Sequence, residues 1–233
     1  MTESVLKTHP RRIPYAFHYE IPEEFTSLPD PTASDGWDEA MRALMPAADD
    51  EQRSAASRQL RAQLPQMSSE EETVVLTALC LGTEEVDGED RLSMGLLAIS
   101  VRPSGHRDQL MTAEGIFRAK EQKFFGSGGA LEEIDYDLGK GVQGPQDMLL
   151  AVKLPCGPAI MSTSLRSLKL PDGDEGRPGV TLPVAALQLV VPAPRDYIVY
   201  VTIATPSVFL LDSHGGRLAH IGRTLAFDAP ESQ

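Results

Sequence analysis

The sequence has little cysteine, no long apolar run and a shortage of positive charge. Its 233 residues include two cysteines, Cys80 and Cys156, which cannot build a disulfide framework. No stretch approaches the ~18 apolar residues that a membrane-spanning helix requires. No apolar segment follows the charges near the N-terminus, so no secretory signal is predicted. We therefore expect a cytoplasmic protein without a membrane span, in which both thiols are reduced and packed in the interior.

The shortage of positive charge excludes one class of partner. The formal net charge is −13, and nucleic-acid binding depends on Lys and Arg side chains that neutralise phosphates. We therefore expect no nucleic-acid partner. The acidic clusters lie between apolar runs, where they either solvate loops and helix ends or form a docking face for a basic partner. These clusters are residues 49–51, 70–72, 84–90, 132–137 and 172–175.

The motifs of common catalytic and cofactor sites are also absent. No CxxC, HxxxH or HExxH spacing occurs and the five histidines are scattered, so no metal site is predicted. The glycine-rich residues 126–129 lack the Lys-Ser/Thr pair that completes a phosphate-binding loop. No GxSxG nucleophile elbow is present. The sequence therefore predicts neither a metal nor an organic cofactor.

What the sequence does contain is typical of a globular domain. Apolar residues make up 41% and charged residues 24%, which are ordinary values for a folded protein. We find no linker, internal repeat or low-complexity segment that divides the chain. We therefore expect one domain over residues 13–228, with flexible tails at 1–12 and 229–233.

Apolar patterning predicts the strands. Residues 15–21 alternate between apolar and polar side chains, as a half-buried strand does. Residues 73–81 and 92–101 are continuously apolar, which indicates that both faces of these strands are covered. Between them Asp87-Gly88 is a strong hairpin signal. Further strands are predicted at 131–136 (weakly), 148–154, 159–168, 182–191 and 197–204.

Because the last four of these strands follow one another without a helix, we expect an antiparallel meander. Covering both faces of the sheet then requires helices on both sides. The sequence thus predicts an α+β fold in which a mainly antiparallel sheet is sandwiched between helices (α/β/α).

Four helices are predicted. The first begins after Ser34 or Asp35 and the second after Asp49 or Asp50, where we expect Arg53, Ser57 and Arg61 to face away from the apolar stripe. The third covers residues 104–125, with Leu110 on its buried stripe, and the last begins at Ser207 as N-cap. In the last helix, we expect Gly215 and Gly216 to let the helix lie close to the sheet.

Four residues are weak candidates for a functional site. Cys156 lies in a loop between two strands and is a candidate nucleophile, although nothing in the sequence pairs it with a histidine. His18 and Glu20 share the polar face of the first strand and form a candidate acid–base pair. Trp37, the one tryptophan, is predicted either in the core or in the lining of a ligand pocket.

Short motifs at the two ends of the chain carry a family resemblance. Ile21-Pro-Glu-Glu-Phe25 follows the first strand, and the final strand is followed by Thr205-Pro206, a helix and the segment Leu225-Ala-Phe-Asp228. In these motifs the chain resembles the Mog1/PsbP-like superfamily, including its uncharacterised bacterial and actinobacterial members. The resemblance implies an antiparallel sheet between helices and a binding or assembly role, since most relatives are non-enzymatic. The resemblance assigns no site residue. Some bacterial members are lipoprotein-like, but this chain lacks their signal and lipid-bearing cysteine, so their location is not expected for it.

These observations favour a non-catalytic binding or accessory protein that acts by protein–protein contact, with a basic partner or a second copy of the chain as candidates. Two alternatives stay open. One is an enzyme with an unrecognised site near Cys156 or near His18 and Glu20. The other is a small-ligand carrier with a pocket between the sheet and a helix.

Overall fold

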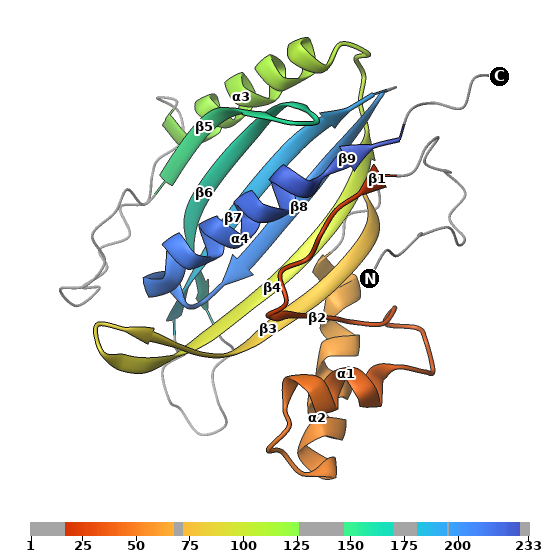
Figure 1. The fold of residues 1–233 in the computed structure, drawn as a ribbon, viewed down its shortest axis with the longest axis vertical. Helices are drawn as coiled ribbons and strands as arrows, with labels where there is room; N and C mark the ends of the chain where they lie inside the picture. The colour runs from red at the N-terminus through yellow and green to blue at the C-terminus, as the bar shows by residue number, and fades with distance from the viewer. Residues whose placement is uncertain (1–16, 68–71, 126–146, 170–180, 195, 229–233) are drawn as a thin grey trace.

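The computed structural model describes residues 17–67, 72–125, 147–169, 181–194 and 196–228. A seven-stranded antiparallel sheet forms its centre, in the order β2-β3-β4-β8-β7-β6-β5 (Figure 1). The predicted α+β class with a mainly antiparallel sheet is therefore confirmed. The predicted strand at 131–136 and the predicted tails lie outside the described residues. The strands of the sheet are β2 Phe25–Ser27, β3 Thr73–Val86, β4 Glu89–Pro103, β5 Asp147–Leu154, β6 Gly157–Lys169, β7 Thr181–Ala193 and β8 Tyr197–Thr205.

The first strand of the described chain is separate from this sheet. β1 (Phe17–His18) pairs in antiparallel fashion with β9 (Ala226–Phe227), so the beginning and the end of the described chain lie side by side. The predicted strand over residues 15–21 is thus two residues long in the described part. The chain then continues as an irregular segment to β2, which pairs with β3 at the edge of the main sheet.

The hairpin between β3 and β4 forms where the sequence predicts it. Asp87 and Gly88 both have positive φ angles, 55° and 81°, as a two-residue type I′ turn requires. The ladder closes on Val86 opposite Glu89. Long apolar runs on both sides of this turn therefore give the two longest strands of the sheet.

Helices cover both faces of the sheet (Figure 1). We define the front face as the one covered by α4 (Leu211–Thr224), whose residues Leu218, Ile221 and Leu225 at its C-cap are buried among the front-face side chains of β7 and β8. On the back face, α3 (Gln109–Phe125) packs against β5, β6 and β7, whereas α1 (Trp37–Leu44) and α2 (Asp50–Gln63) pack near β2, β3 and β4. The back face thus has two separate helical layers. Single 3₁₀ turns follow α2 and precede α4, at Leu64–Met67 and Val208–Leu210.

Close packing of α4 on the sheet depends on a glycine that the sequence did not single out. A Cβ atom at Gly222 would lie 2.7 Å from Cδ2 of Leu189, so only glycine fits without a shift of the Leu189 side chain. The prediction that Gly215 and Gly216 have this role was wrong. At Gly215 a Cβ atom would make an ordinary 3.9 Å contact, and at Gly216 it would meet open space.

Three helices begin later than predicted. α1 begins at Trp37 with Gly36 as its N-cap, so neither Ser34 nor Asp35 caps it. α3 begins at Gln109 because the carboxylate of Asp108 accepts hydrogen bonds from the backbone N–H groups of Leu110 and Met111. Leu110 is 69% exposed, so its predicted place on the buried stripe was wrong. Ser207 is not an N-cap by its side chain: its hydroxyl donates to the carbonyl of Leu92 instead.

α2 begins as predicted but faces the rest of the protein differently. A capping box between Asp49 and Gln52 fixes its start. Ser57 is its buried residue, and Arg53 and Arg61 reach across to carbonyl groups of the preceding loops. The expectation that these three residues face elsewhere was wrong, because the long arginine side chains satisfy backbone carbonyls that α2 covers.

Candidate functional site

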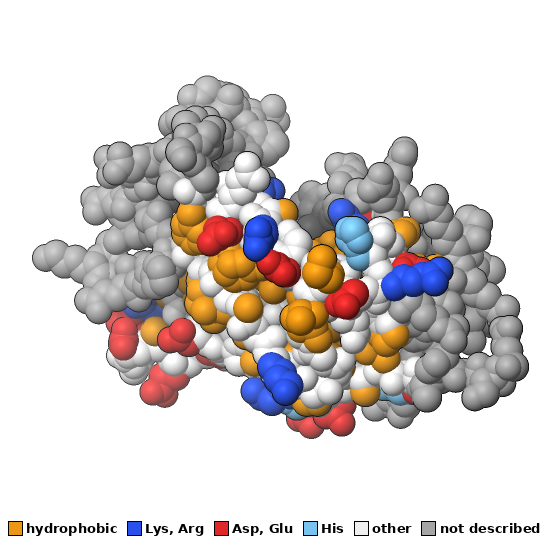
Figure 2. Space-filling view, turned by 90° about the horizontal axis from the view of Figure 1, so that it is seen from above, with side chains coloured by type: hydrophobic (Ala, Val, Ile, Leu, Met, Phe, Trp, Pro, Cys, Tyr) orange, Lys and Arg blue, Asp and Glu red, His pale blue; other side chains and the backbone are white. Residues whose placement is uncertain are grey.

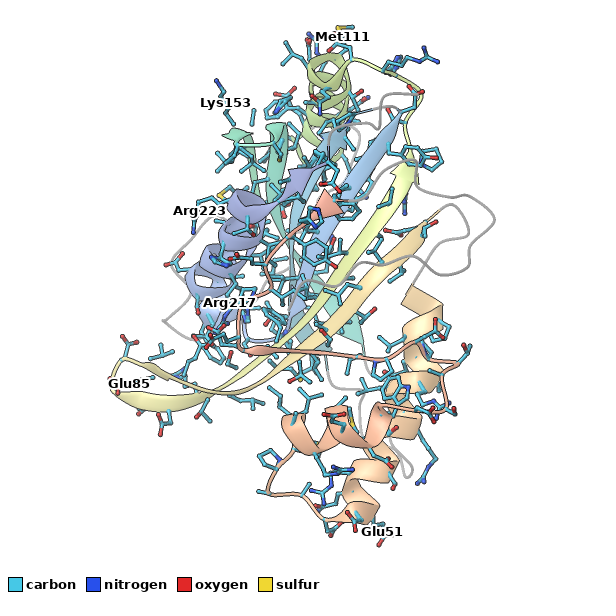
Figure 3. The ribbon with its side chains drawn as sticks, turned by 45° about the vertical axis from the view of Figure 1, so that its right-hand side comes forward. Glu51, Glu85, Met111, Lys153, Arg217 and Arg223 are labelled. Atoms are coloured by element: carbon cyan, nitrogen blue, oxygen red, sulfur yellow. The ribbon has the colours of Figure 1, made fainter. Side chains whose placement is uncertain are left out.

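A groove of about 1460 Å³ lies between α4 and the irregular segment formed by residues 17–27. The segment is held in place at Glu20, whose backbone N–H donates to Oγ1 of Thr224 over 3.0 Å. Arg217, in the middle of α4, lines the groove beside this segment (Figure 3). The groove is lined by Phe17, His18, Tyr19, Glu20, Ile21, Pro22, Glu23, Glu24, Ser27, Ser213, Gly216, Arg217, His220 and Thr224.

Beneath the groove a buried ion pair joins α4 to the β3–β4 hairpin. Nη2 of Arg217 donates to Oε1 of Glu84 over 2.7 Å, although the two residues are 133 positions apart. Ser213, one helical turn before Arg217, donates to Oε2 of Glu84 over 2.7 Å, and Ser93 on β4 donates to Oε1. The carboxylate therefore accepts three hydrogen bonds, one from the neighbouring strand β4 and two from α4, which is remote in sequence.

These contacts change the acidity of Glu84. Burial by itself raises the pKa of a carboxyl group, but the hydrogen bonds from Ser93, Ser213 and Arg217, together with the charge of Arg217, outweigh burial. They lower the pKa of Glu84 from 4.5 to about 2. Glu84 is thus a fixed negative charge at neutral pH, and it holds the guanidinium group of Arg217 at the floor of the groove.

His214 extends this network into the interior. It is completely buried, its Nδ1 lies 3.2 Å from Nη1 of Arg217, and its Nε2 lies 3.2 Å from Oγ1 of Thr205. Burial, and next the charge of Arg217, lower the pKa of His214 from 6.5 to about 4. A Cβ atom on Gly95 would lie 3.0 Å from Cε1 of the ring, so glycine at this position makes room for the imidazole.

Thr205 closes the network against the sheet. Its hydroxyl donates to the carbonyl of Met94 over 2.6 Å and accepts from the backbone N–H of Ser207 over 2.9 Å. His214 is therefore neutral and both of its ring nitrogens are engaged, so it has no free position at which to exchange a proton with a ligand. The network positions Arg217; it does not resemble an acid–base pair.

One donor of Arg217 remains available. The side chain is 9% exposed, and its Nε has no hydrogen-bond partner in the structure. Oε1 of Glu24, on the opposite wall of the groove, lies 3.5 Å from this atom. A buried donor without a partner costs stability unless a ligand satisfies it. Nε of Arg217 is thus a buried donor that lies in an ion pair with Glu24 but has no hydrogen-bond partner in the structure.

The structure places His18 and Glu20 at this groove but does not pair them with each other. Nε2 of His18 lies 2.9 Å from Oδ1 of Asp228, and Oε2 of Glu20 lies 3.7 Å from Nε2 of His220. The hypothesis of a His18–Glu20 acid–base pair therefore has no support in the contacts of either residue. Both side chains belong instead to the rim of the groove.

The two other candidates lie elsewhere. Cys156 is in the turn between β5 and β6, and burial raises the pKa of its thiol, whereas a reactive cysteine has a lowered pKa. Trp37 is 3% exposed in the core between α1 and the sheet, and its indole N–H donates to the carbonyl of Asp30. Trp37 therefore belongs to the core and not to a pocket.

Sequence reasoning missed Glu84, His214 and Arg217. Glu84 belongs to the acidic cluster 84–90, for which the sequence predicted either a solvated loop or a docking face. No local pattern shows that this residue lies under α4. The one available signal was on α4 itself. His214 and Arg217 interrupt an apolar stripe that Leu211, Leu218 and Ile221 define, and a polar residue on a buried stripe needs a partner.

Comparison of the chain with models of protein families, with curated proteins and with solved structures gave no match. Within the described residues, no three His, Cys, Asp or Glu side chains are grouped so that they could hold a metal ion. In the same part of the chain, no helix has the length and apolar character needed to cross a membrane. A function must therefore be argued from the groove and the network beneath it.

Proposed function

We propose that this protein is a non-catalytic binding or accessory protein, which takes an extended, cationic segment of a partner protein into the groove beside α4. The observation that carries this proposal is the composition of the groove. Exposed glutamates form its rim, Phe17 and Tyr19 line it, and Arg217 contributes a buried donor. His214, which lies beneath the groove, is neutral and has both ring nitrogens in hydrogen bonds.

The rim supplies complementary charge for a basic segment. Glu20 and Glu24 have side chains that are 73% and 52% exposed, and Glu23 is also exposed. Arg217 is 9% exposed and already bonded to Glu84, so it offsets little of this negative charge at the surface. Carboxylates on a partly enclosed wall attract Lys and Arg side chains and speed association.

The remaining lining suits the rest of such a segment. The rings of Phe17 and Tyr19 lie 5.7 Å apart and can contact the aliphatic part or the charge of a lysine or arginine. Nε of Arg217 can donate to a backbone carbonyl of the bound segment. Affinity would then come from a main-chain contact, and specificity from the glutamates.

The likeness to the Mog1/PsbP-like superfamily is part of this proposal. The succession of strand, Thr-Pro step, helix and short strand on which it rests is the order of β8, Thr205-Pro206, α4 and β9. Most members of that superfamily are binding or assembly factors, which agrees with the function proposed from the groove.

A pair of matched variants tests the proposal. We expect affinity purification with the wild-type protein to retain a partner that Glu20→Lys/Glu23→Lys does not retain. Glu39→Lys/Glu51→Lys changes the net charge equally on α1 and α2, away from the groove, and should behave as wild type. Association should slow several-fold between about 50 and 500 mM salt, because salt screens a steered encounter. Equal capture by both variants, or turnover of a substrate by the isolated protein, would contradict the proposal.

A small-ligand carrier is the second candidate, because the groove of about 1460 Å³ has room for a molecule of the size that fills a ligand pocket of roughly 300–1,000 Å³. Native mass spectrometry separates the two functions. A small molecule retained by wild type and lost in Ser213→Leu, which obstructs the groove, would favour the carrier.

Self-association is the third proposal, and a different surface favours it. Leu110, Met111 and Phe125 on α3 are 69%, 61% and 58% exposed. Figure 2 looks onto the end of the molecule at which α3 lies, and hydrophobic side chains gather there among charged ones. Leu110 and Met111 lie at the start of α3 and Phe125 ends it, and neighbouring exposed apolar side chains such as the first two commonly mark a protein interface. If they join two copies, Leu110→Asp should lower the mass measured by analytical ultracentrifugation, whereas Leu92→Asp, 56% exposed on β4, should not.

A further inference from the structure

The back face of the sheet is only partly covered between its two helical layers. In β7 and β8, the front-face residues Leu187 and Ile203 are 2% and 0% exposed. Their back-face neighbours Ala186, Gln188 and Thr202 are only partly buried, although they stand in the central strands. The residues packed against α3 and those packed against α1 and α2 form separate clusters. We refer to the partly exposed surface between them, formed by Ala98, Ala186, Gln188, Thr202 and Ala204, as the back-face strip; it ends at Leu96, which packs against the α1 and α2 cluster.

Lys120 of α3 lies at one end of this strip. Its Nζ donates to Oγ of Ser162 over 3.1 Å and to Oε1 of Gln188 over 2.8 Å. Nε2 of Gln188 in turn donates to Oγ1 of Thr202 over 3.1 Å, which fixes the amide with its oxygen toward the lysine. The same ammonium group lies 5.6 Å from the centre of the Phe124 ring. The lysine is thus held in one position by side chains of α3, β6, β7 and β8.

This cation has no anionic partner. None of the salt bridges in the described part of the chain includes Lys120. Burial, and next the charge of Lys123, lower the pKa of Lys120. An ammonium group has three donors and only two are used, both by neutral acceptors. By contrast, Arg217 and Arg53, which are 9% and 18% exposed, are paired with Glu84 and Asp50, respectively.

We propose that Lys120 binds the carboxylate group of an organic acid, whose apolar part lies on the back-face strip. A single ammonium group beside a hydroxyl and an amide matches the one charge of a carboxylate, whereas phosphate sites gather several cations or backbone N–H groups. Arg166, whose guanidinium lies over the same Phe124 ring, has Asp147 at 3.6 Å and does not add a free charge.

The sheet register places a suitable surface beside the charge. Gln188 is opposite Thr202, which is opposite Ala98, so small side chains continue from Lys120 across the strip. In the adjacent row Ala186 is opposite Ala204, which is opposite Leu96. Two neighbouring rows of small and apolar side chains can therefore contact an aliphatic chain whose carboxylate meets Lys120.

The site lies on the face opposite to α4, so its test is independent of the function proposed for the groove. The probe is octanoate, titrated into ¹⁵N-labelled protein, with octan-1-ol and inorganic phosphate in parallel. We expect octanoate to shift the backbone amide signals of Ala98, Ala186, Gln188 and Thr202. Loss of one charge-assisted contact in Lys120→Met should weaken binding about tenfold. Lys120→Arg should retain most of the affinity, and Lys123→Met, an exposed lysine on the same helix, should change it less than about twofold.

Several outcomes would overturn the proposal. One is octanoate binding with equal affinity to wild type and Lys120→Met. Others are shifts confined to α4 or to residues 17–27, binding of octan-1-ol as tight as that of octanoate, and binding of phosphate but not of octanoate. If Lys120→Met does not fold, the shift map of the wild-type protein with the three probes still decides the matter.

Discussion

The guanidinium group of Arg217 donates a hydrogen bond to Nδ1 of His214 over 3.2 Å, and this contact determines the tautomer of a fully buried imidazole. A guanidinium group has donors only, so Nδ1 must accept and the ring proton must be on Nε2, toward Thr205. A second proton on the ring would point at a positive charge. The contact thus couples the protonation of His214 to the position of Arg217, which lines the groove.

The first prediction concerns acid stability. The pKa of His214 is lowered from 6.5 to about 4 in the folded protein, so the unfolded chain binds a proton more readily than the folded one does. The free energy of unfolding should therefore fall as the pH falls from about 6.5 to about 4, by on the order of 3 kcal/mol from this residue. Below pH 4.5 Glu84 lowers the free energy of unfolding further, because its carboxyl group binds a proton at a higher pH in the unfolded chain than in the folded protein. Urea unfolding at pH 7.5, 5.5 and 4.5 measures this slope.

A partly exposed histidine provides the control for this pH dependence. His220 has a side chain that is 43% exposed on the same helix, so His220→Gln is the matched control for a histidine-to-glutamine substitution in α4. His214→Gln should flatten the slope between pH 7.5 and 4.5, although the variant is less stable at neutral pH. A wild-type protein whose unfolding free energy is constant across this range would refute the assignment of a buried neutral imidazole.

The second prediction concerns the Glu84–Arg217 pair. Arg217→Met removes a partner that is 9% exposed and leaves Glu84 bonded to Ser93 and Ser213 only. Each of Glu84→Gln and Arg217→Met should lower the free energy of unfolding by about 1–3 kcal/mol. The double variant should lose less than the sum of the two, by at least about 1 kcal/mol, because the side chains act on each other directly. Additive effects in urea unfolding would show that the two residues are not coupled.

The third prediction separates two glycines of α4. At Gly216 a Cβ atom meets open space, so Gly216→Ala should raise the free energy of unfolding by about 0.5–1 kcal/mol through helix propensity. At Gly222 the same atom would lie 2.7 Å from Leu189, and Gly222→Ala should lower it by about 1 kcal/mol or more through overpacking. Thermal unfolding of both variants tests the comparison. Equal stabilisation by the two substitutions would mean that α4 does not lie this close to β7.

The sequence predicted the strands and helices because their signals are local. The continuous apolar runs and the Asp87-Gly88 turn are short-range patterns, and they indicated β3 and β4 correctly. The capping box at Asp49 likewise placed the start of α2. Errors arose where a distant element decided the outcome. Ser207 forms its hydrogen bonds with β4 instead of capping a helix, and the glycine that contacts the sheet is Gly222.

The candidate site was only partly predictable for the same reason. His18 and Glu20 were identified as polar residues on one strand, and they do lie at the groove. Their partners, Asp228 and His220, are about 200 positions away, so no spacing rule could pair them. The contact between Glu84 and Arg217 spans 133 positions and exists because α4 crosses the front face above the β3–β4 hairpin. Only the arrangement of elements in space shows it.

The last prediction concerns local stability on the back face. In α2 the buried residue is Ser57, whereas α1 buries Trp37, Ala40, Met41 and Leu44. Because α1 is anchored by four buried apolar residues and α2 is not, we expect α2 to open before the sheet. Amides of residues 50–63 should exchange with solvent faster than those of residues 187–191 in β7, because a segment with few buried apolar contacts has a small free energy of local unfolding.

A substitution within α2 makes this expectation specific. Ser57→Ala replaces a buried hydroxyl by a better helix former and should raise protection over residues 50–63 by about 0.5 kcal/mol, while β7 stays unchanged. Hydrogen exchange followed by mass spectrometry resolves the two segments in one experiment. If residues 50–63 and 187–191 are equally protected in the wild-type protein, α2 opens only with the whole domain and not as a separate unit. Its packing against α1 would then stabilise it far more than one buried serine can explain.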